Sequence, residues 1–290
     1  MAETISEIKK LDLAPGDLIK RVENIKNNLG GENMACLNLD GVKLVEGNLM
    51  RTDLSGAKLN GADFRGSDLM GAKLNETELT GAIFRGAQLN QVSFREVKAR
   101  KSDFSGSNLV ETDFFGSDLT EARLDKALIT KAKLDSITLK NASCVSTDFT
   151  HSSMKVADLS GANFTNARIL QVDLREADLT QTNFSGANLA QCNISVADLT
   201  NANLSRAKMA MAWLVSAELI DTNLKEADLE KVYLESKLPD SAKPDVIRQL
   251  LMDCLEQHFG SLSAVVTQNN AADLALKEIE SVLKRYELKQ

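Results

Sequence analysis

The chain has 290 residues and a net charge of −7, from 34 basic and 41 acidic side chains. This acidic balance argues against direct nucleic-acid binding, and four cysteines without clustered spacing argue against a disulfide framework or a zinc site. Residues 1–11 lack the apolar core of a signal peptide, and no apolar run approaches the roughly 18 residues of a membrane span. We therefore expect a cytoplasmic protein in a reducing compartment, without membrane association.

Residues 1–35 precede the regular part of the chain and predict a helix. Pro15 suits the first helical turn, and Gly30 and Gly31 provide a stop signal. The apolar residues of this segment share one helical face: Leu18, Val22, Ile25 and Leu29. We expect an N-terminal helical cap on the repeat that follows, because a repeat array needs covered ends. Recruitment of a partner is the alternative interpretation.

A five-residue repeat occupies residues 36–238. From Leu39 to Leu234 every fifth residue is large and apolar, with Ala99 and Cys144 as the two exceptions. Each unit reads small, polar, large apolar, polar, and then a fifth slot that holds 11 of the 16 glycines. A period of five matches neither a helix nor a strand. If each unit turns one corner, four units close a square coil, and about ten coils stack into an all-β solenoid with the small and large slots inside.

Several units carry a recognisable motif: Ala57-Lys-Leu-Asn-Gly, Ala62-Asp-Phe-Arg-Gly, Ala162-Asn-Phe-Thr-Asn and Ala187-Asn-Leu-Ala-Gln. They resemble the A(D/N)LXX repeat of pentapeptide-repeat proteins, a family with quinolone-resistance and cyanobacterial members. The resemblance implies a right-handed quadrilateral β-helix. It also implies one possible activity, since the best understood members resemble B-form DNA in shape and bind type II topoisomerases. Those members often carry loops that interrupt the repeat, and this chain has none.

Residues 20 apart are expected to stack on one outer face. The polar slot of one such column holds Asp118, Thr138, Asp158, Asp178, Asp198 and Glu218. We call Asp158, Asp178, Asp198 and Glu218 the acidic ladder. It could mimic DNA phosphates that meet a basic groove. We favour the simpler interpretation, in which Asp is common in this slot because its side chain bonds to the backbone of the nearby turn.

The same face carries a basic cluster, Lys98, Arg100 and Lys101, around the small residue Ala99. A small side chain in a large slot leaves room for two interpretations. The coil could open, so that residues 95–102 protrude as a binding loop. Alternatively, Ala99 is a minor packing defect among solvated charges, with Val97 filling part of the volume.

An apolar group is expected on the outside near the C-terminal end of the repeat. Trp213 and Tyr233 are 20 residues apart, and the same arithmetic places Val215 and Val196 beside them. We call these four residues the aromatic patch. Docking of the following helices is the first explanation for such a surface, and a partner interface is the second. A weaker apolar stripe is expected from Met50, Met70 and Val110.

Residues 239–290 abandon the five-residue period and predict a C-terminal module of two helices, at 243–258 and 271–286. One helix would suffice as a lid on the rod, so the surplus apolar surface favours self-association or docking to another protein. The family resemblance supports homodimerisation through these helices. A hairpin packed on its own rod would satisfy the same pattern.

Catalytic signals are absent from the sequence. The two histidines, His151 and His258, are far apart and have no evident ligand set, and no Gly-Lys pair suggests a phosphate loop. We expect neither enzyme activity nor a cofactor nor a metal. The predicted function is a non-enzymatic protein–protein interaction scaffold or adaptor. The alternative is a DNA mimic that binds DNA gyrase through the acidic ladder.

Overall fold

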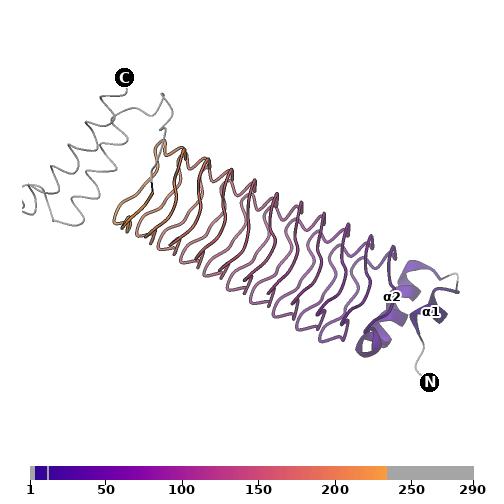
Figure 1. Ribbon diagram of the computed structural model, residues 1–290. Helices are drawn as coiled ribbons and strands as arrows, with labels where there is room; N and C mark the ends of the chain where they lie inside the picture. Colours follow the sequence, from indigo (N-terminus) through magenta and orange to yellow (C-terminus); the bar gives the residue numbers. More distant parts are fainter. Residues whose placement is uncertain (1–3, 12, 234–290) are drawn as a thin grey trace, which may run out of the picture.

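The computed structural model describes residues 4–11 and 13–233 of the chain. Two helices, α1 (Ile5–Ile8) and α2 (Pro15–Asn24), and a short 3₁₀ turn (Lys26–Asn28) precede a long rod of stacked coils (Figure 1). The predicted C-terminal module, residues 239–290, lies outside the described residues. So do Leu234 and His258.

The N-terminal helices pack into the same core as the rod. Thr4 and Glu7 form a capping box at the start of α1, with Glu7 N donating to Thr4 Oγ1 at 3.3 Å and Thr4 N donating to Glu7 Oε2 at 2.9 Å. Val22 and Leu29 are fully buried and join the apolar cluster of the first coils. The α-helix ends five residues before Leu29, because the carbonyl of Lys26 accepts a hydrogen bond from Asn48 N at 2.9 Å and so pairs with the first coils.

Each coil of the rod takes 20 residues. Isolated parallel bridges join residues 20 apart, from Asn33↔Asp53 through to Trp213↔Tyr233. Only one residue of each unit forms such a bridge, the polar residue before the large slot, so no long strands appear. Backbone hydrogen bonds such as Phe64 N to Ile83 O, 2.7 Å, join each coil to the next. The predicted four-sided coil is confirmed.

The fifth slot of every unit turns the corner with a left-handed backbone. From Cys36 to Lys231 its residues have φ between 53° and 73°. Glycine tolerates this conformation, but most of these corners carry side chains. The least favourable are Val156 (φ 58°) and Val196 (φ 63°), because a β-branched residue with positive φ is a steric outlier. Such strain costs on the order of 1–3 kcal/mol per residue.

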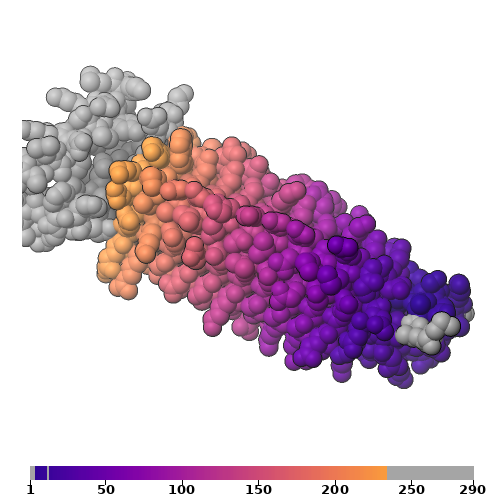
Figure 2. All heavy atoms as spheres, turned by 60° about the horizontal axis from the view of Figure 1, so that its bottom comes forward, coloured from indigo at the N-terminus to yellow at the C-terminus, as the bar shows by residue number. Residues whose placement is uncertain are grey.

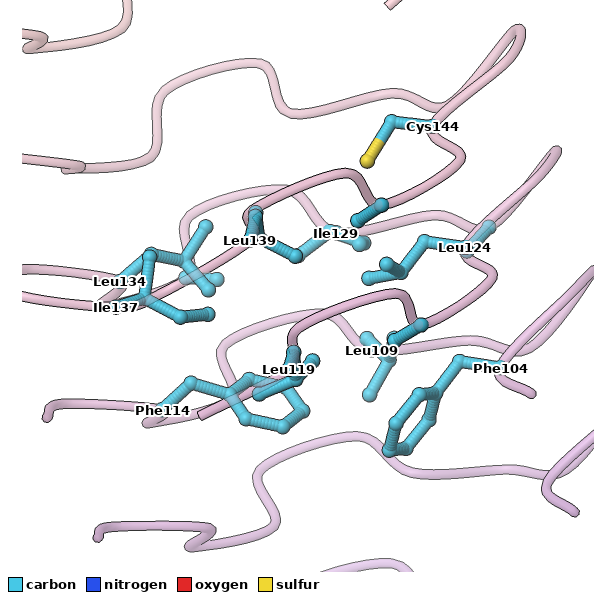
Figure 3. Packing of buried hydrophobic residues seen from close by; sticks show 14 of the residues in the cluster. Phe104, Leu109, Phe114, Leu119, Leu124, Ile129, Leu134, Ile137, Leu139 and Cys144 are labelled. Atoms are coloured by element: carbon cyan, nitrogen blue, oxygen red, sulfur yellow. The ribbon is translucent and has the colours of Figure 1, made fainter. Parts of the chain in front are cut away.

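Phenylalanine rings align inside the rod as the 20-residue period predicts. Phe64, Phe84 and Phe104 stack with successive centroid distances of 4.8 Å and interplanar angles of 4° and 2°. From the opposite wall, Phe94 and Phe114 stack at 4.5 Å and meet the first set edge to face, with Phe94 at 5.8 Å from Phe104. Figure 3 shows Phe104 and Phe114 pointing into the interior together with neighbouring leucines.

The coil does not open at Ala99. Residues 95–102 follow the regular pattern of turns and bridges, with Ala99 fully buried and Val97 almost so. The suggested binding loop is therefore wrong, because the coil stays closed and regular here. The physical reason is that the coil-to-coil backbone hydrogen bonds continue through this unit, with Ala99 N donating to Asp118 O at 2.7 Å and Lys101 N donating to Thr120 O at 3.0 Å.

Candidate binding surfaces

The acidic ladder forms one continuous column on the rod. Parallel bridges join Asp158 to Asp178, Asp178 to Asp198, and Asp198 to Glu218. Their carboxylates are thus one coil apart, at a spacing of roughly 4.8 Å. Within residues 4–11 and 13–233, no lysine or arginine lies at ion-pair distance from these four carboxylates.

Most of the ladder carboxylates are also bonded to their own turns. Asp158 Oδ1 accepts from Ser160 N at 3.0 Å and from Ser160 Oγ at 2.6 Å. Asp178 accepts from Thr180 N at 2.9 Å, and Asp198 accepts from Thr200 N at 2.8 Å. These are the local contacts that make Asp suitable in this slot irrespective of any partner. The expected turn contact is confirmed, and each of these three carboxylates keeps its second oxygen for other contacts.

The basic cluster is matched by acids of the next coil. Arg100 Nη1 lies 3.6 Å from Asp118 Oδ2, and Lys101 Nζ lies 3.6 Å from Glu121 Oε2. Lys98 bridges to Asp118 through the backbone. The basic cluster and the acidic ladder share one wall, which therefore changes sign along its length. Exposed pairs of this kind add little stability individually.

Asp63, which lies outside the acidic ladder, has a carboxylate that is paired with an arginine. Arg65 donates several hydrogen bonds to Asp63, the shortest from Nη2 to Oδ2 at 2.6 Å and from Nε to Oδ1 at 2.9 Å. These bonds from Arg65 lower the pKa of the Asp63 carboxyl, outweighing the opposing effect of partial burial. Asp63 is thus committed to a structural pair with its neighbour.

The aromatic patch lies on a different wall, at the C-terminal end of the rod, where the colour turns to orange in Figure 2. Trp213 and Tyr233 have ring centroids 4.8 Å apart with an interplanar angle of 31°. Trp213 is 49% exposed, Tyr233 43% and Val196 59%, whereas Val215 is half-buried. Val196 N donates to Val215 O at 2.9 Å, so the four residues adjoin. The predicted outward placement is confirmed.

Sequence reasoning missed two neighbours of the aromatic patch. Met211 is exposed at the corner next to Trp213, and Val156 is 58% exposed on the same corner column as Val196, two coils earlier. A β-branched residue in the fifth slot is the signal that could have revealed Val156. The weaker stripe is not continuous, because Met70 is exposed whereas Met50 and Val110 are half-buried.

Chemically reactive groups are scattered over the described part of the chain. His151 is exposed at a corner, and Cys144 and Cys192 are buried in the core, where burial raises the pKa of the Cys192 thiol to about 12. No group of three or more His, Cys, Asp or Glu residues within 4–11 and 13–233 could hold a metal. A shallow depression of about 190 Å³ near Ser205 contains an ion pair, Arg206 to Glu226 at 2.7 Å. None of these features supplies a nucleophile with a base.

No helix in the described ranges is long and apolar enough to cross a membrane.

A family model described as pentapeptide repeats matches eight segments that together span residues 33–235. A search of curated proteins finds no match. Among solved structures the chain is similar to HetL, a pentapeptide repeat protein involved in heterocyst differentiation regulation from the cyanobacterium Nostoc sp. strain PCC 7120. The identity is 27%, the TM-score is 0.58, and the match covers 77% of this chain and 97% of HetL.

Two further similarities have TM-scores too low for a structural argument. A pentapeptide repeat protein of the Arabidopsis thaliana thylakoid lumen is 26% identical, with a TM-score of 0.28 over 41% of this chain and 74% of that one. QnrB1, a plasmid-mediated fluoroquinolone resistance protein, is 20% identical in its full-length structure, with a TM-score of 0.30 over 76% of this chain and 99% of that one.

Proposed function

This chain belongs to the pentapeptide repeat family, whose model spans residues 33–235, and we propose that it is a non-enzymatic scaffold for protein–protein interaction. The fold implied is the family's right-handed quadrilateral β-helix. Such a rod is filled by its own side chains and offers patterned outer walls rather than a pocket. We infer a cytoplasmic location and a helical cap at each end, of which the C-terminal one, residues 239–290, could also pair two copies.

The observation that carries the proposal is the aromatic patch. Trp and Tyr are enriched at protein interfaces, and here they adjoin with about half of each side chain exposed. A rigid rod can present such a surface without the entropic cost of ordering a loop. The similar protein HetL is involved in the regulation of heterocyst differentiation, and a regulatory role is consistent with binding rather than catalysis.

An affinity pull-down with the full-length chain tests the proposal. Trp213→Ser with Tyr233→Ser should lose the specific partner. Phe115→Ser is the matched control, since Phe115 is a 39%-exposed aromatic residue on the same wall, five coils from Val215. If the double variant captures the same proteins as the wild type and the control, the aromatic patch is not the binding surface.

A second candidate function rests on the acidic ladder. Four stacked carboxylates without a described cationic partner could meet a basic groove, as a mimic of DNA phosphates would. This candidate predicts inhibition of gyrase supercoiling that weakens with added salt and with Lys substitutions at Asp158, Asp178 and Asp198. Glu46→Lys, a charge reversal at a distant exposed corner, is the control. An unchanged supercoiling activity at micromolar protein would eliminate the candidate.

A further inference from the structure

The chain leaves the described rod from within the aromatic patch. Tyr233 is the last described residue and stacks on Trp213, so residues 234–290 begin on the exposed wall itself. A segment attached at this point has a high effective concentration over the patch. The nearest candidate to cover the patch is therefore a part of the same chain.

Two strained valines lie along one edge of this wall, with the exposed Glu176 between them and the Asp173–Arg175 ion pair in the intervening coil. Val196 and Val156 share one corner column, both with positive φ and both nearly 60% exposed. Apart from Cys36 and Met211, the other corners of the rod use glycine or polar residues, which fit the left-handed backbone or water better. Strained residues persist where another interaction requires them.

The wall fits one α-helix laid along the rod axis. From Val156 to Tyr233 it spans four coils, or roughly 19 Å at 4.8 Å per coil. The coil spacing is close to the helical pitch of about 5.4 Å, so one helical turn would meet each coil. A helix over residues 244–258 would be about 22 Å long, which matches the wall.

The sequence of 244–258 has the required pattern. Pro244 suits the first turn, and Gly260 follows the end. Apart from Met252, its apolar residues form two adjacent rows on one face: Val246, Leu250 and Cys254, and Ile247, Leu251 and Leu255. The ten residues before Pro244 could span up to about 35 Å, which is enough to reach any point of the wall.

We propose that residues 244–258 form a helix that docks along this wall and covers Trp213, Tyr233, Val196 and Val156 in the free protein. The proposal rests on the proposed function in one respect, because a partner that uses the aromatic patch must displace this helix. The segment then regulates access to the binding surface. Pairing of two copies is not required.

Trp213 is the chain's only tryptophan, so its fluorescence reports the docking directly in the full-length protein. The wild type should show blue-shifted emission and weak quenching by iodide. Leu251→Asp, in an apolar row, should shift the emission to the red and raise the quenching constant at least about twofold, as Trp213 returns to the 49% exposure of the open wall. Gln249→Asp, on the opposite helical face, should leave both unchanged.

Three results would overturn the proposal. Trp213 could show fully exposed emission in the wild type and no response to Leu251→Asp. It could respond to Leu283→Asp in place of Leu251→Asp, which would assign the wall to residues 271–286. Protection could also vanish on dilution, which would assign the wall to a second copy.

A second variant guards against loss of folding. Val196→Gly removes an apolar contact and also relieves backbone strain, so the rod should melt no lower than the wild type while Trp213 becomes more accessible to iodide. A pull-down then separates this proposal from the proposed function. If Leu251→Asp exposes Trp213 but captures no more partner, the docking stands and the patch is not the binding surface. If Trp213 is accessible to iodide in the wild type and in every variant, and a partner still binds the aromatic patch, the docking proposal is wrong and the proposed function stands.

Discussion

Replacing Leu159 by Asp should abolish the cooperative folding of the rod at neutral pH. Leu159 is fully buried in the large slot of its unit, between Leu139 and Leu179 of the adjacent coils. Losing its apolar burial costs about 1.5–3 kcal/mol. A carboxyl group in this interior would have its pKa raised by up to about 3–5 units. At about 1.36 kcal/mol per unit, ionisation at pH 7 costs roughly 4–7 kcal/mol more.

The total of about 6–10 kcal/mol is comparable to the whole stability of a typical folded domain, about 5–15 kcal/mol. Thermal unfolding followed by circular dichroism measures the effect. In the Asp variant the carboxyl pKa is higher in the folded state than in the unfolded one, so the folded state binds the proton more tightly. Stability should therefore be highest below pH 4 and fall as the pH rises through the raised pKa.

Two control variants isolate the charge. Leu159→Asn has a similar shape and no titratable group, so it should be destabilised without this pH dependence. Lys140→Asp places the same carboxylate in an exposed slot and should change stability by no more than about 0.5 kcal/mol. A Leu159→Asp protein that melts like the wild type at pH 7 would refute the assignment of the large slot to the core.

Three further substitutions test other parts of the rod. Ala99→Leu should destabilise it by about 1–3 kcal/mol, because Ala99 is fully buried in a closed coil and a larger side chain there would overpack it; a stabilised variant, seen as a higher melting temperature, would reveal an unfilled cavity. Gly106→Val should lower the free energy of unfolding by about 1–3 kcal/mol through its positive φ alone, since a Cβ there meets no atom within 4 Å. Equal denaturant midpoints for the variant and the wild type would show that a valine is not strained at this corner. Arg65→Met should raise the pKa of Asp63 toward about 3.9, as measured by NMR titration. The stability that this pair contributes above pH 4, which is lost as the pH falls through the lowered pKa, should then be missing in the variant. An unchanged pKa of Asp63 would assign the shift to other groups.

The repeat allowed most of the rod to be predicted from the sequence. A fixed period fixes both the coil and the columns, because residues 20 apart must stack once four units close a turn. The alignment of Phe64, Phe84 and Phe104 and the exposure of Trp213 and Tyr233 follow from that arithmetic alone. Few folds connect sequence spacing to side-chain direction so directly.

The departures from prediction come from interactions between units. Ala99 looks like a defect in a one-dimensional pattern, and only the backbone hydrogen bonds to the next coil, such as Ala99 N to Asp118 O at 2.7 Å, show why the coil stays closed. The helix before the rod ends at Asn24 because the next residues bond to the first coils, which a helical pattern does not reveal. Val156 was missed because the corner slot was read for glycine rather than for strained apolar residues. The binding roles of the aromatic patch and the acidic ladder remain predictions.

The 20-residue coil means that the number of five-residue units determines the wall on which each surface residue lies. Removing or inserting a single unit would keep the small and large slots inside the rod, but it would move every downstream surface residue to the neighbouring wall, a rotation of a quarter-turn. Inserting four units would lengthen the rod by one coil and return the downstream residues to their original walls. The angle between the N-terminal helices and the wall that bears Trp213 is therefore set by how many units separate them, counted modulo four. Insertion or loss of a unit can thus change that angle while the pattern of small and large slots is kept.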